Sequence, residues 1–201
     1  MLLAPRKEKV AQVVALRTRS LTVVLDQLED SFNMAAVLRT CEGMGIQDVH
    51  VIENPEFPFI PHAKVTQGCD KWLDLHLYRD SATCMQQLKA KGFTCWVSAV
   101  GAGARSVYEL AFDAPVALVF GNERTGVTAE TLTAADGLFW IPMRGFTQSF
   151  NISVAVAASV TRAISWRMEH GRAAGDLSPV ETEALTQRFF RLSVKQRRRI
   201  Y

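Results

Sequence analysis

The chain has 201 residues, of which 48% are hydrophobic and 21% charged, and its formal net charge is +3. This length suits one α/β domain with a core of its own, and it is too short for two ordinary domains with separate cores. No apolar run approaches the roughly 20 residues that a membrane-spanning helix requires. The first residues also lack the layout of a secretory signal. We therefore expect a cytoplasmic protein that binds no membrane.

The cysteines and histidines are scattered along the chain, without CxxC pairs or the spacing of metal ligands. We expect the four cysteines to be buried free thiols. No metal site is predicted.

The positive charge is concentrated at the two ends of the chain. Residues 1–20 hold five basic residues against one acidic, and residues 160–201 hold nine against four, so the body between them is acidic. Such ends suit a partner with a phosphate backbone, because Lys and Arg displace counterions when they neutralise phosphates. Solvated tails that favour solubility are the alternative, and charge alone leaves both open.

Extended and helical patterns alternate along the chain. In order, we expect a strand at 21–25, a helix at 33–44, strands at 48–52 and 72–78, a helix at 82–91, strands at 93–100 and 115–120 separated by a glycine-rich turn at 101–103, a helix at 129–135, a strand at 138–143, and helices at 151–166 and 179–201. Repeated β-then-α units predict an α/β fold, with a mainly parallel sheet covered by helices on both faces. Ligands bind such sheets beyond the carboxyl ends of the strands, which places the loops after Val97, Phe120 and Ile141 at one rim.

Asn33 stands at the start of the first of these helices, and Arg39 follows six residues later. Six residues span about 9 Å along a helix at 1.5 Å per residue. Helical side chains lean toward the N-terminus and Arg is long, so the Arg39 guanidinium can approach Asn33. Alternatively, Asn33 only caps the helix.

The sequence GNERTG at residues 121–126 directly follows a predicted buried strand. Gly121 and Gly126 allow positive φ and close approach of the backbone to a ligand, which suits a turn that contacts a nucleoside. The segment fits neither the P-loop nor the GxGxxG dinucleotide pattern. An ordinary strand-to-helix turn is the alternative.

Residues 141–153, IPMRGFTQSFNIS, leave a strand, pass a glycine and enter a long apolar helix. Ser149, Asn151 and Ser153 lie at alternate positions there. One of Ser149 and Asn151 is expected to cap the helix, but a cap does not require all three.

Together the ordered motifs NxxxxxR, GNExxG and IPMxG followed by SxNxS resemble the SpoU branch of the SPOUT methyltransferases, over about residues 21–166. The resemblance implies a deep trefoil knot in the C-terminal half of this domain, although folded chains are rarely knotted. It also implies a homodimer whose active site draws on both subunits. The implied reaction is methylation of an RNA 2'-hydroxyl by S-adenosylmethionine, without a metal.

The resemblance also assigns roles to individual residues. The positions that match cofactor-binding groups are Ser98, Gly121, Ile141 and Phe150. Arg39 matches the residue proposed to activate the ribose hydroxyl, and Asn33, Glu123, Ser149 and Asn151 complete the catalytic set. Because Arg is almost never deprotonated in proteins, we expect Arg39 to orient the hydroxyl and a nearby phosphate. Any role as a base is then confined to the complex with RNA and donor.

The ends of the chain favour a tRNA substrate. Residues 1–20 and 167–201 form short basic extensions around a 21–166 domain, which is similar to the layout of tRNA guanosine-18 2'-O-methyltransferases. Ribosomal RNA, or another tRNA position, is the alternative. Two other classes are less favoured: an RNA-binding protein without catalytic turnover, and a nucleotide-binding protein that does not bind RNA.

The residues expected to contact RNA are Arg6, Lys7, Arg17, Arg19, Arg162, Arg167, Arg172, Arg197, Arg198 and Arg199. Phe150 and Ile152 stand where aliphatic pairs are common in the family, a mild departure.

Overall fold

The computed structural model describes residues 4–57, 59 and 66–197 of the chain. Its strands are β1 (Leu21–Asp26), β2 (Asp48–Ile52), β3 (Asp74–Tyr78), β4 (Thr94–Ser98), β5 (Arg105–Ser106), β6 (Val116–Gly121) and β7 (Gly137–Trp140). They form one sheet in the order β3-β2-β1-β6-β4-β7-β5, and every pair of neighbours is parallel. The predicted parallel sheet is confirmed.

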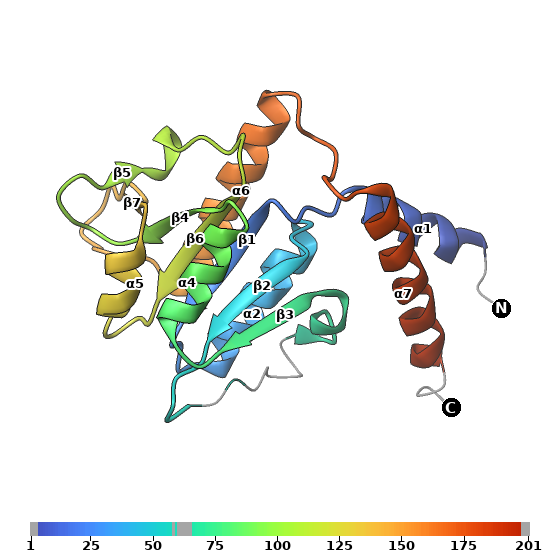
Figure 1. Ribbon diagram of the computed structural model, residues 1–201, viewed down its shortest axis with the longest axis horizontal. Coiled ribbons are helices and arrows are strands. Elements are labelled where there is room, and N and C mark those ends of the chain that lie inside the picture. Colours follow the sequence, from blue (N-terminus) through green and yellow to red (C-terminus); the bar gives the residue numbers. More distant parts are fainter. Residues whose placement is uncertain (1–3, 58, 60–65, 198–201) are drawn as a thin grey trace.

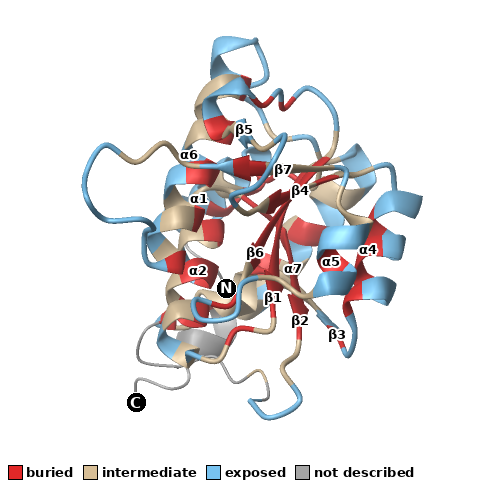
Figure 2. Ribbon diagram, turned by 90° about the vertical axis from the view of Figure 1, so that its left-hand side faces the viewer, coloured by how far each residue is buried: buried red, intermediate tan, exposed pale blue. Residues whose placement is uncertain are grey.

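The helices are α1 (Ala4–Ala15), α2 (Ser31–Gly43), α4 (Ser81–Ala90), α5 (Ala129–Ala134), α6 (Ile152–Glu169) and α7 (Pro179–Arg197), with short 3-10 turns η1 (Asp70–Trp72) and η2 (Val107–Glu109). Helices α2 and α6 cover one face of the sheet, and α4 and α5 cover the other (Figures 1 and 2). The sheet therefore lies between two layers of helices, as the alternating pattern predicted. None of the described helices combines the length and hydropathy needed to cross a membrane.

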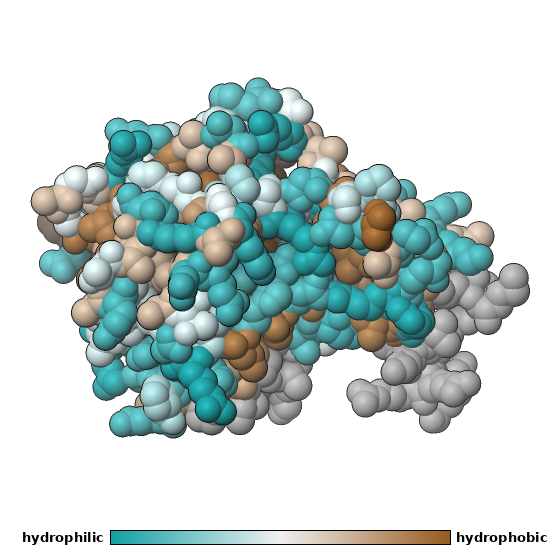
Figure 3. All heavy atoms as spheres, in the orientation of Figure 1, coloured by the Kyte–Doolittle hydropathy of each residue, from teal (hydrophilic) through white to brown (hydrophobic). Residues whose placement is uncertain are grey.

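Every residue of β1 is buried, because helices cover both faces of the sheet. Val23 and Leu25 belong to the hydrophobic cluster that α2 and α6 complete, whereas Val24 points to the opposite face, into the cluster of α4. Successive side chains of a strand point to opposite faces, so a strand between two helical layers has no polar side. The outer surface over α4 and α5 mixes hydrophilic and moderately hydrophobic residues (Figure 3).

The two ends of the chain fold together rather than extending as separate arms. Helix α1, which was not predicted from the sequence, packs on α7 through a cluster of Val10, Val14, Leu185 and Phe189. This pair of helices lies at one end of the molecule, beside the sheet (Figure 1). The helix expected at 179–201 is confirmed over Pro179–Arg197, and it packs on the N-terminal segment.

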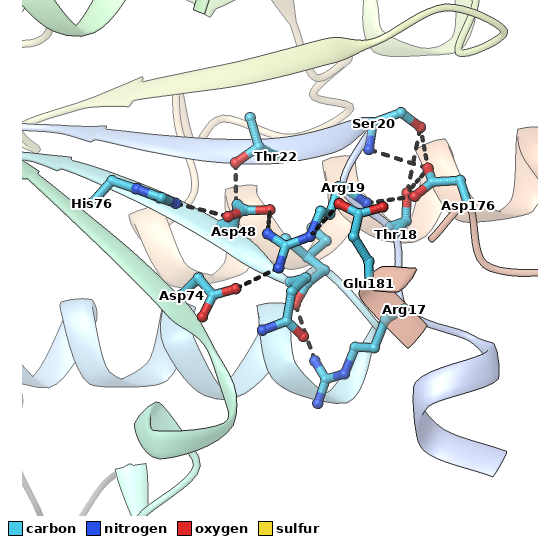
Figure 4. A network of polar contacts seen from close by, with 12 residues as sticks. Arg17, Thr18, Arg19, Ser20, Thr22, Asp48, Asp74, His76, Asp176 and Glu181 are labelled. Atoms are coloured by element: carbon cyan, nitrogen blue, oxygen red, sulfur yellow. Dashed lines mark hydrogen bonds and ion pairs between the residues drawn. The ribbon is translucent and has the colours of Figure 1, made fainter. Parts of the chain in front are cut away.

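Asp176 links the segment before α7 to the segment after α1 (Figure 4). Its carboxylate accepts hydrogen bonds from the backbone N–H groups of Arg19 at 2.6 Å and Ser20 at 3.1 Å, and from the Thr18 hydroxyl. Gly175 N–H donates to the Ala15 carbonyl at 2.9 Å. Burial opposes ionisation of Asp176, but the hydrogen bonds from Ser20 and Thr18 outweigh it and hold its pKa below the usual range. The two terminal segments are thus joined at the amino end of β1.

Several predicted boundaries were wrong: the helices expected at 33–44 and 151–166 lie at Ser31–Gly43 and Ile152–Glu169, and the strand expected at 93–100 lies at Thr94–Ser98. The strand expected at 138–143 ends at Trp140, and Pro142 follows, which has no N–H to donate to a sheet. The strand expected at 72–78 begins at Asp74, because Trp72 belongs to a 3-10 turn.

Candidate active site

A cleft of about 800 Å³ opens at the carboxyl ends of β4, β6 and β7. This volume lies in the range of about 300–1,000 Å³ that is usual for small-molecule sites. The expectation that the loops after Val97, Phe120 and Ile141 share one rim is confirmed. The residues that line the cleft are Ser98, Ala99, Val100, Phe120, Gly121, Asn122, Glu123, Gly126, Phe139, Trp140, Ile141, Met143, Gly145, Phe146, Thr147, Gln148, Ser149, Phe150, Ile152 and Ala155.

The turn after β6 is held by its own backbone. Asn122 and Gly126 exchange two backbone hydrogen bonds of 2.9 Å each, and the buried Asn122 side chain accepts the N–H of Arg124 at 2.8 Å. Gly126 has φ +73°, as expected of a turn glycine. Gly121 serves another purpose: a Cβ there would lie 2.3 Å from the carbonyl carbon of Gly126. The close packing of the turn on itself therefore requires glycine at this position.

Asn33 joins the three motifs through its side chain. Its amide N–H donates to Glu123 Oε1 at 2.5 Å, and its carbonyl oxygen accepts from Asn151 Nδ2 at 3.0 Å. Asn33 does not cap α2, because the N-cap is Asp30, whose carboxylate accepts from Phe32 N–H at 2.7 Å. The alternative interpretation of Asn33 as a cap was therefore wrong. The Asn33 amide is instead engaged at both ends by side chains of the other two motifs.

Asn151 caps α6 and also takes part in this bridge. Its Oδ1 accepts the backbone N–H of Ser153 at 2.9 Å and the Ser153 hydroxyl at 2.6 Å, while its amide nitrogen reaches Asn33. One side chain thus ties the end of the cleft loop to α2. Ser149 lies in the exposed part of this loop and lines the cleft.

The residues predicted to bind the cofactor, Ser98, Gly121, Ile141 and Phe150, all line the cleft. They come from three different loops, which only the folded sheet brings together. Their role in binding stays a prediction.

Arg39 is not among the described residues that line the cleft of its own chain. It is exposed on α2, near Cys69, whose thiol has a pKa raised to about 11 by burial and by Glu42 and Asp70, with Arg39 opposing. Within one chain, Glu123 and Ser149 line the cleft, and Asn33 and Asn151 are tied to Glu123 by hydrogen bonds, whereas Arg39 is in neither group.

Three of the arginines predicted to contact RNA are engaged by groups of their own chain (Figure 4 shows two of them). Arg17 is 0% exposed and donates to the Glu42 carboxylate at 2.6 Å; burial lowers its pKa, and Glu42 only partly offsets this. Arg19 pairs with Asp48, Asp74 and Glu181. Arg167, also buried, donates to the carbonyls of Phe112 and Ser20 and to the Thr18 hydroxyl. Arg17 and Arg167 are thus too deeply buried to contact RNA, and their prediction as RNA contacts was wrong. Arg19 is partly exposed, and its three ion pairs hold it within the chain.

The other predicted RNA contacts lie nearer the surface. Lys7 and Arg172 are exposed, Arg6 donates to the Ser193 hydroxyl at 3.3 Å, and Arg162 pairs with Glu169 at 3.4 Å. Arg197 ends α7, but its side chain lies outside the described part of the structure, as do residues Arg198 and Arg199 altogether.

Within the described part of the chain, no group of three or more His, Cys, Asp or Glu side chains is arranged to hold a metal ion. The buried polar groups near the cleft are amides, hydroxyls and single carboxylates. Two of these, Asn122 and Asp26, were not predicted from the sequence, although Asn122 stands inside one of the three motifs. Asp26 offered no signal beyond a polar residue at the end of an apolar run.

A parallel α/β sheet, with a cleft at the ends of three strands and a Glu123–Asn33–Asn151 bridge that starts from its lining, is the arrangement expected of a methyltransferase of the α/β class. The chain belongs to the SpoU rRNA Methylase family, whose model matches residues 20–160. The resemblance found in the motifs is confirmed.

Individual relatives agree with this assignment. The tRNA (guanosine(18)-2'-O)-methyltransferase of Borreliella burgdorferi is 35% identical over 94% of this chain and 86% of its own length. The enzyme of the same name from Thermus thermophilus is 34% identical, over 83% of this chain and 85% of its own. The solved structure of the A. aeolicus TrmH/SpoU tRNA modifying enzyme has a TM-score of 0.87 at 26% identity, and covers 96% of this chain and 99% of that one.

Proposed function

We propose that this protein transfers a methyl group from S-adenosylmethionine to the 2'-hydroxyl of a ribose in tRNA, at guanosine 18. The observation that carries the proposal is the side-chain bridge from Glu123 through Asn33 to Asn151 at the mouth of the cleft. The two relatives from Borreliella burgdorferi and Thermus thermophilus, which have this activity in their names, match 94% and 83% of the chain.

The cleft fits an adenosyl group. Its volume of about 800 Å³ is sufficient, and the side chains of Phe139, Ile141 and Ile152 offer apolar surface while the loops supply backbone donors and acceptors. When bound, S-adenosylmethionine supplies an electrophilic methyl group. Ser98, Gly121, Ile141 and Phe150 would hold it, mainly through the backbone of the three loops.

The polar bridge would position the substrate ribose. A 2'-hydroxyl is a poor nucleophile, so catalysis depends on orienting it and on removing its proton. Asn33 and Asn151 hold each other through their amides, and Asn33 fixes one carboxylate oxygen of Glu123. The other oxygen of Glu123 and the exposed Ser149 hydroxyl are then available to the ribose. This division of roles needs no metal.

Arg39 would reach the reaction from a second copy of the chain. It lies outside the cleft of its own subunit, yet the surface around the cleft exposes large apolar side chains: Phe32 is 55% exposed, Phe150 44% and Val154 48%, and Phe146 is fully exposed. Contiguous apolar side chains on a surface favour association. A homodimer would cover them and bring a second Arg39, from the other copy, to the bridge, where it would orient the hydroxyl and an RNA phosphate.

The same proposal includes the trefoil knot and the cytoplasmic location. The loops that follow β4 and β7 both contribute residues to the cleft, and threading of the chain through one of them would form the knot. Of the basic residues, Arg6, Lys7, Arg162, Arg172 and the end of α7 at 197–199 would contact tRNA phosphates. Phosphate contacts would position the tRNA without reading its sequence.

Transfer of labelled methyl groups to a mixture of unmodified tRNA and ribosomal RNA, followed by mapping of the modified ribose, tests the proposal. We expect label in tRNA alone, as 2'-O-methylguanosine at position 18. Asn33→Ala should lower kcat by about 100-fold or more, which is typical when a positioning contact is lost, with tRNA affinity retained. The matched control is Asn54→Ala, whose side chain accepts from Glu56 N–H in an exposed loop. Label confined to ribosomal RNA, or full activity of Asn33→Ala, contradicts the proposal.

A further inference from the structure

A fully buried carboxylate lies behind the cleft wall formed by residues 121–126. Asp26 is the last residue of β1 and is 0% exposed. It is not among the residues that line the cleft, so it is placed to contact neither donor nor RNA. Burying a carboxylate is costly unless hydrogen bonds replace the lost water. Its partners therefore indicate what it does for the protein.

The partners of Asp26 are neutral groups that begin helices. Asp26 Oδ2 accepts the backbone N–H of Thr128 at 2.9 Å and its hydroxyl at 3.2 Å, and Oδ1 accepts the Ser81 hydroxyl at 3.4 Å. The Ser81 and Thr128 hydroxyls are themselves 2.8 Å apart. Thr128 is the N-cap of α5, and Ser81 is the first residue of α4. One carboxylate thus joins the ends of three elements.

Residues 26 and 27 hold both ends of the turn that forms the cleft wall. At the start of the turn, Gly121 pairs with Asp26 in the sheet, and Asn122 Nδ2 donates to the Gln27 carbonyl at 3.1 Å. At its end, the Asp26 carboxylate holds Thr128. Between them the turn packs so closely that a Cβ on Gly121 would lie 2.4 Å from the Val127 nitrogen. A shift of Thr128 would therefore move the wall itself.

We infer that Asp26 is a positioning residue, which sets the shape of the methyl-donor cleft through Thr128. The inference rests on the proposed function, because the wall matters only if the cleft binds the donor. Without the carboxylate, Thr128 and the turn before it are released, and the wall that carries Gly121, Glu123 and Gly126 moves. Donor affinity falls as a result, whereas tRNA affinity does not. A purely structural Asp26 would affect stability and leave donor affinity unchanged.

The test compares Asp26→Asn, Thr128→Val and Asp176→Asn with the wild-type protein. Asp176→Asn is the matched control, since this carboxylate also accepts several hydrogen bonds but lies at the amino end of β1, at the opposite end of the sheet. Calorimetric titration with S-adenosylhomocysteine gives the affinity of the cleft, filter binding gives the affinity for tRNA, and thermal unfolding gives stability.

We expect Asp26→Asn to raise the Kd for S-adenosylhomocysteine at least tenfold, with the tRNA Kd within twofold of wild type. Thr128→Val keeps the backbone N–H and should raise the Kd for S-adenosylhomocysteine about threefold. This variant tests the inference if Asp26→Asn does not fold. Asp176→Asn should lower the unfolding midpoint with the donor Kd unchanged. A folded Asp26→Asn or Thr128→Val protein that binds the ligand like wild type overturns the inference.

The role of Asp26 and the proposed function fail in different ways. If wild type binds S-adenosylhomocysteine and methylates tRNA while both variants behave like it, only the role of Asp26 is wrong. If wild type binds no S-adenosylhomocysteine, the proposed function fails and the role of Asp26 fails with it.

Discussion

Replacing Arg167 by Met should lower the melting temperature (Tm) of the protein strongly, without directly affecting its contacts with tRNA. The buried guanidinium donates to the Phe112 carbonyl at 3.1 Å, the Thr18 hydroxyl at 2.8 Å and the Ser20 carbonyl at 3.0 Å. Its loss leaves the Phe112 carbonyl without this donor, at a cost of about 1–3 kcal/mol, and removes two further charge-assisted bonds. It also takes away the cation 3.6 Å from Asp176.

Together these losses should lower the free energy of unfolding by about 3–5 kcal/mol, as when one partner of a buried pair is removed. For a chain of this size, that corresponds to a fall in Tm of about 6–20 °C. Thermal unfolding at one protein concentration measures it. The control is Arg172→Met, because Arg172 is exposed and donates to the Asp113 carbonyl at the surface.

The affinity for tRNA, measured below the Tm, completes the comparison. Arg172→Met should weaken tRNA binding and change Tm by little. If Arg167→Met instead keeps the wild-type Tm and loses tRNA affinity, the exclusion of Arg167 from the RNA contacts is wrong.

Three further perturbations follow from the structure. Gly121→Ala forces a Cβ to within 2.3 Å of Gly126 backbone and should weaken S-adenosylhomocysteine binding at least tenfold by calorimetry, whereas Gly43→Ala, with open space around it, should not. The lowered pKa of Asp176 stabilises the folded protein at pH values above the pKa of this group in the unfolded chain, about 3.9. This stabilisation is lost as the pH falls through the lower pKa of the folded state. Urea unfolding between about pH 2.5 and 7 should therefore show a free energy of unfolding that falls less steeply toward acid pH for Asp176→Asn than for wild type. Lys7→Gln should reduce the slope of log affinity for tRNA against log salt by about one, and an unchanged slope would exclude Lys7 as a phosphate contact.

The strands and the cleft could be predicted because their signals are local. β1 is mainly a run of Leu, Thr and Val whose side chains are buried on both faces of the sheet. Parallel strands of this kind place the loops that follow them at one rim. The motifs at residues 121–126 and 141–153 lie in those loops, and their convergence was expected from the order of the elements. The place of Asn33 beside them was expected only from the resemblance to the family.

The terminal regions could not be predicted in the same way. Helix α1 has only a narrow apolar stripe, and it is stabilised by Leu185 and Phe189, which lie at the other end of the chain. Arg17 and Arg167 look like surface charges in the sequence, and only the fold shows that they pair with Glu42 and the Phe112 carbonyl. A count of charged residues gives the net charge of a segment, but it does not show which side chains face solvent.

Asn33 shows the same limit within the site. Its position suggested a helix cap, and the cap turned out to be Asp30, three residues earlier. That difference of about one helical turn frees the Asn33 amide to join Glu123 and Asn151. Helix boundaries are hard to place from a sequence, and here the boundary decides the role of the residue.

The most direct test of the proposed site is a crystal structure of the protein with S-adenosylhomocysteine. We predict that the adenosyl group lies between residues 98–100, 121–126 and 141–150, with the homocysteine sulfur facing the Asn33 bridge and the Arg39 side chain of a second copy nearby. Ligand bound at another surface, or a cleft that stays closed to it at saturating concentration, would contradict the claim that these three segments form one methyl-transfer site.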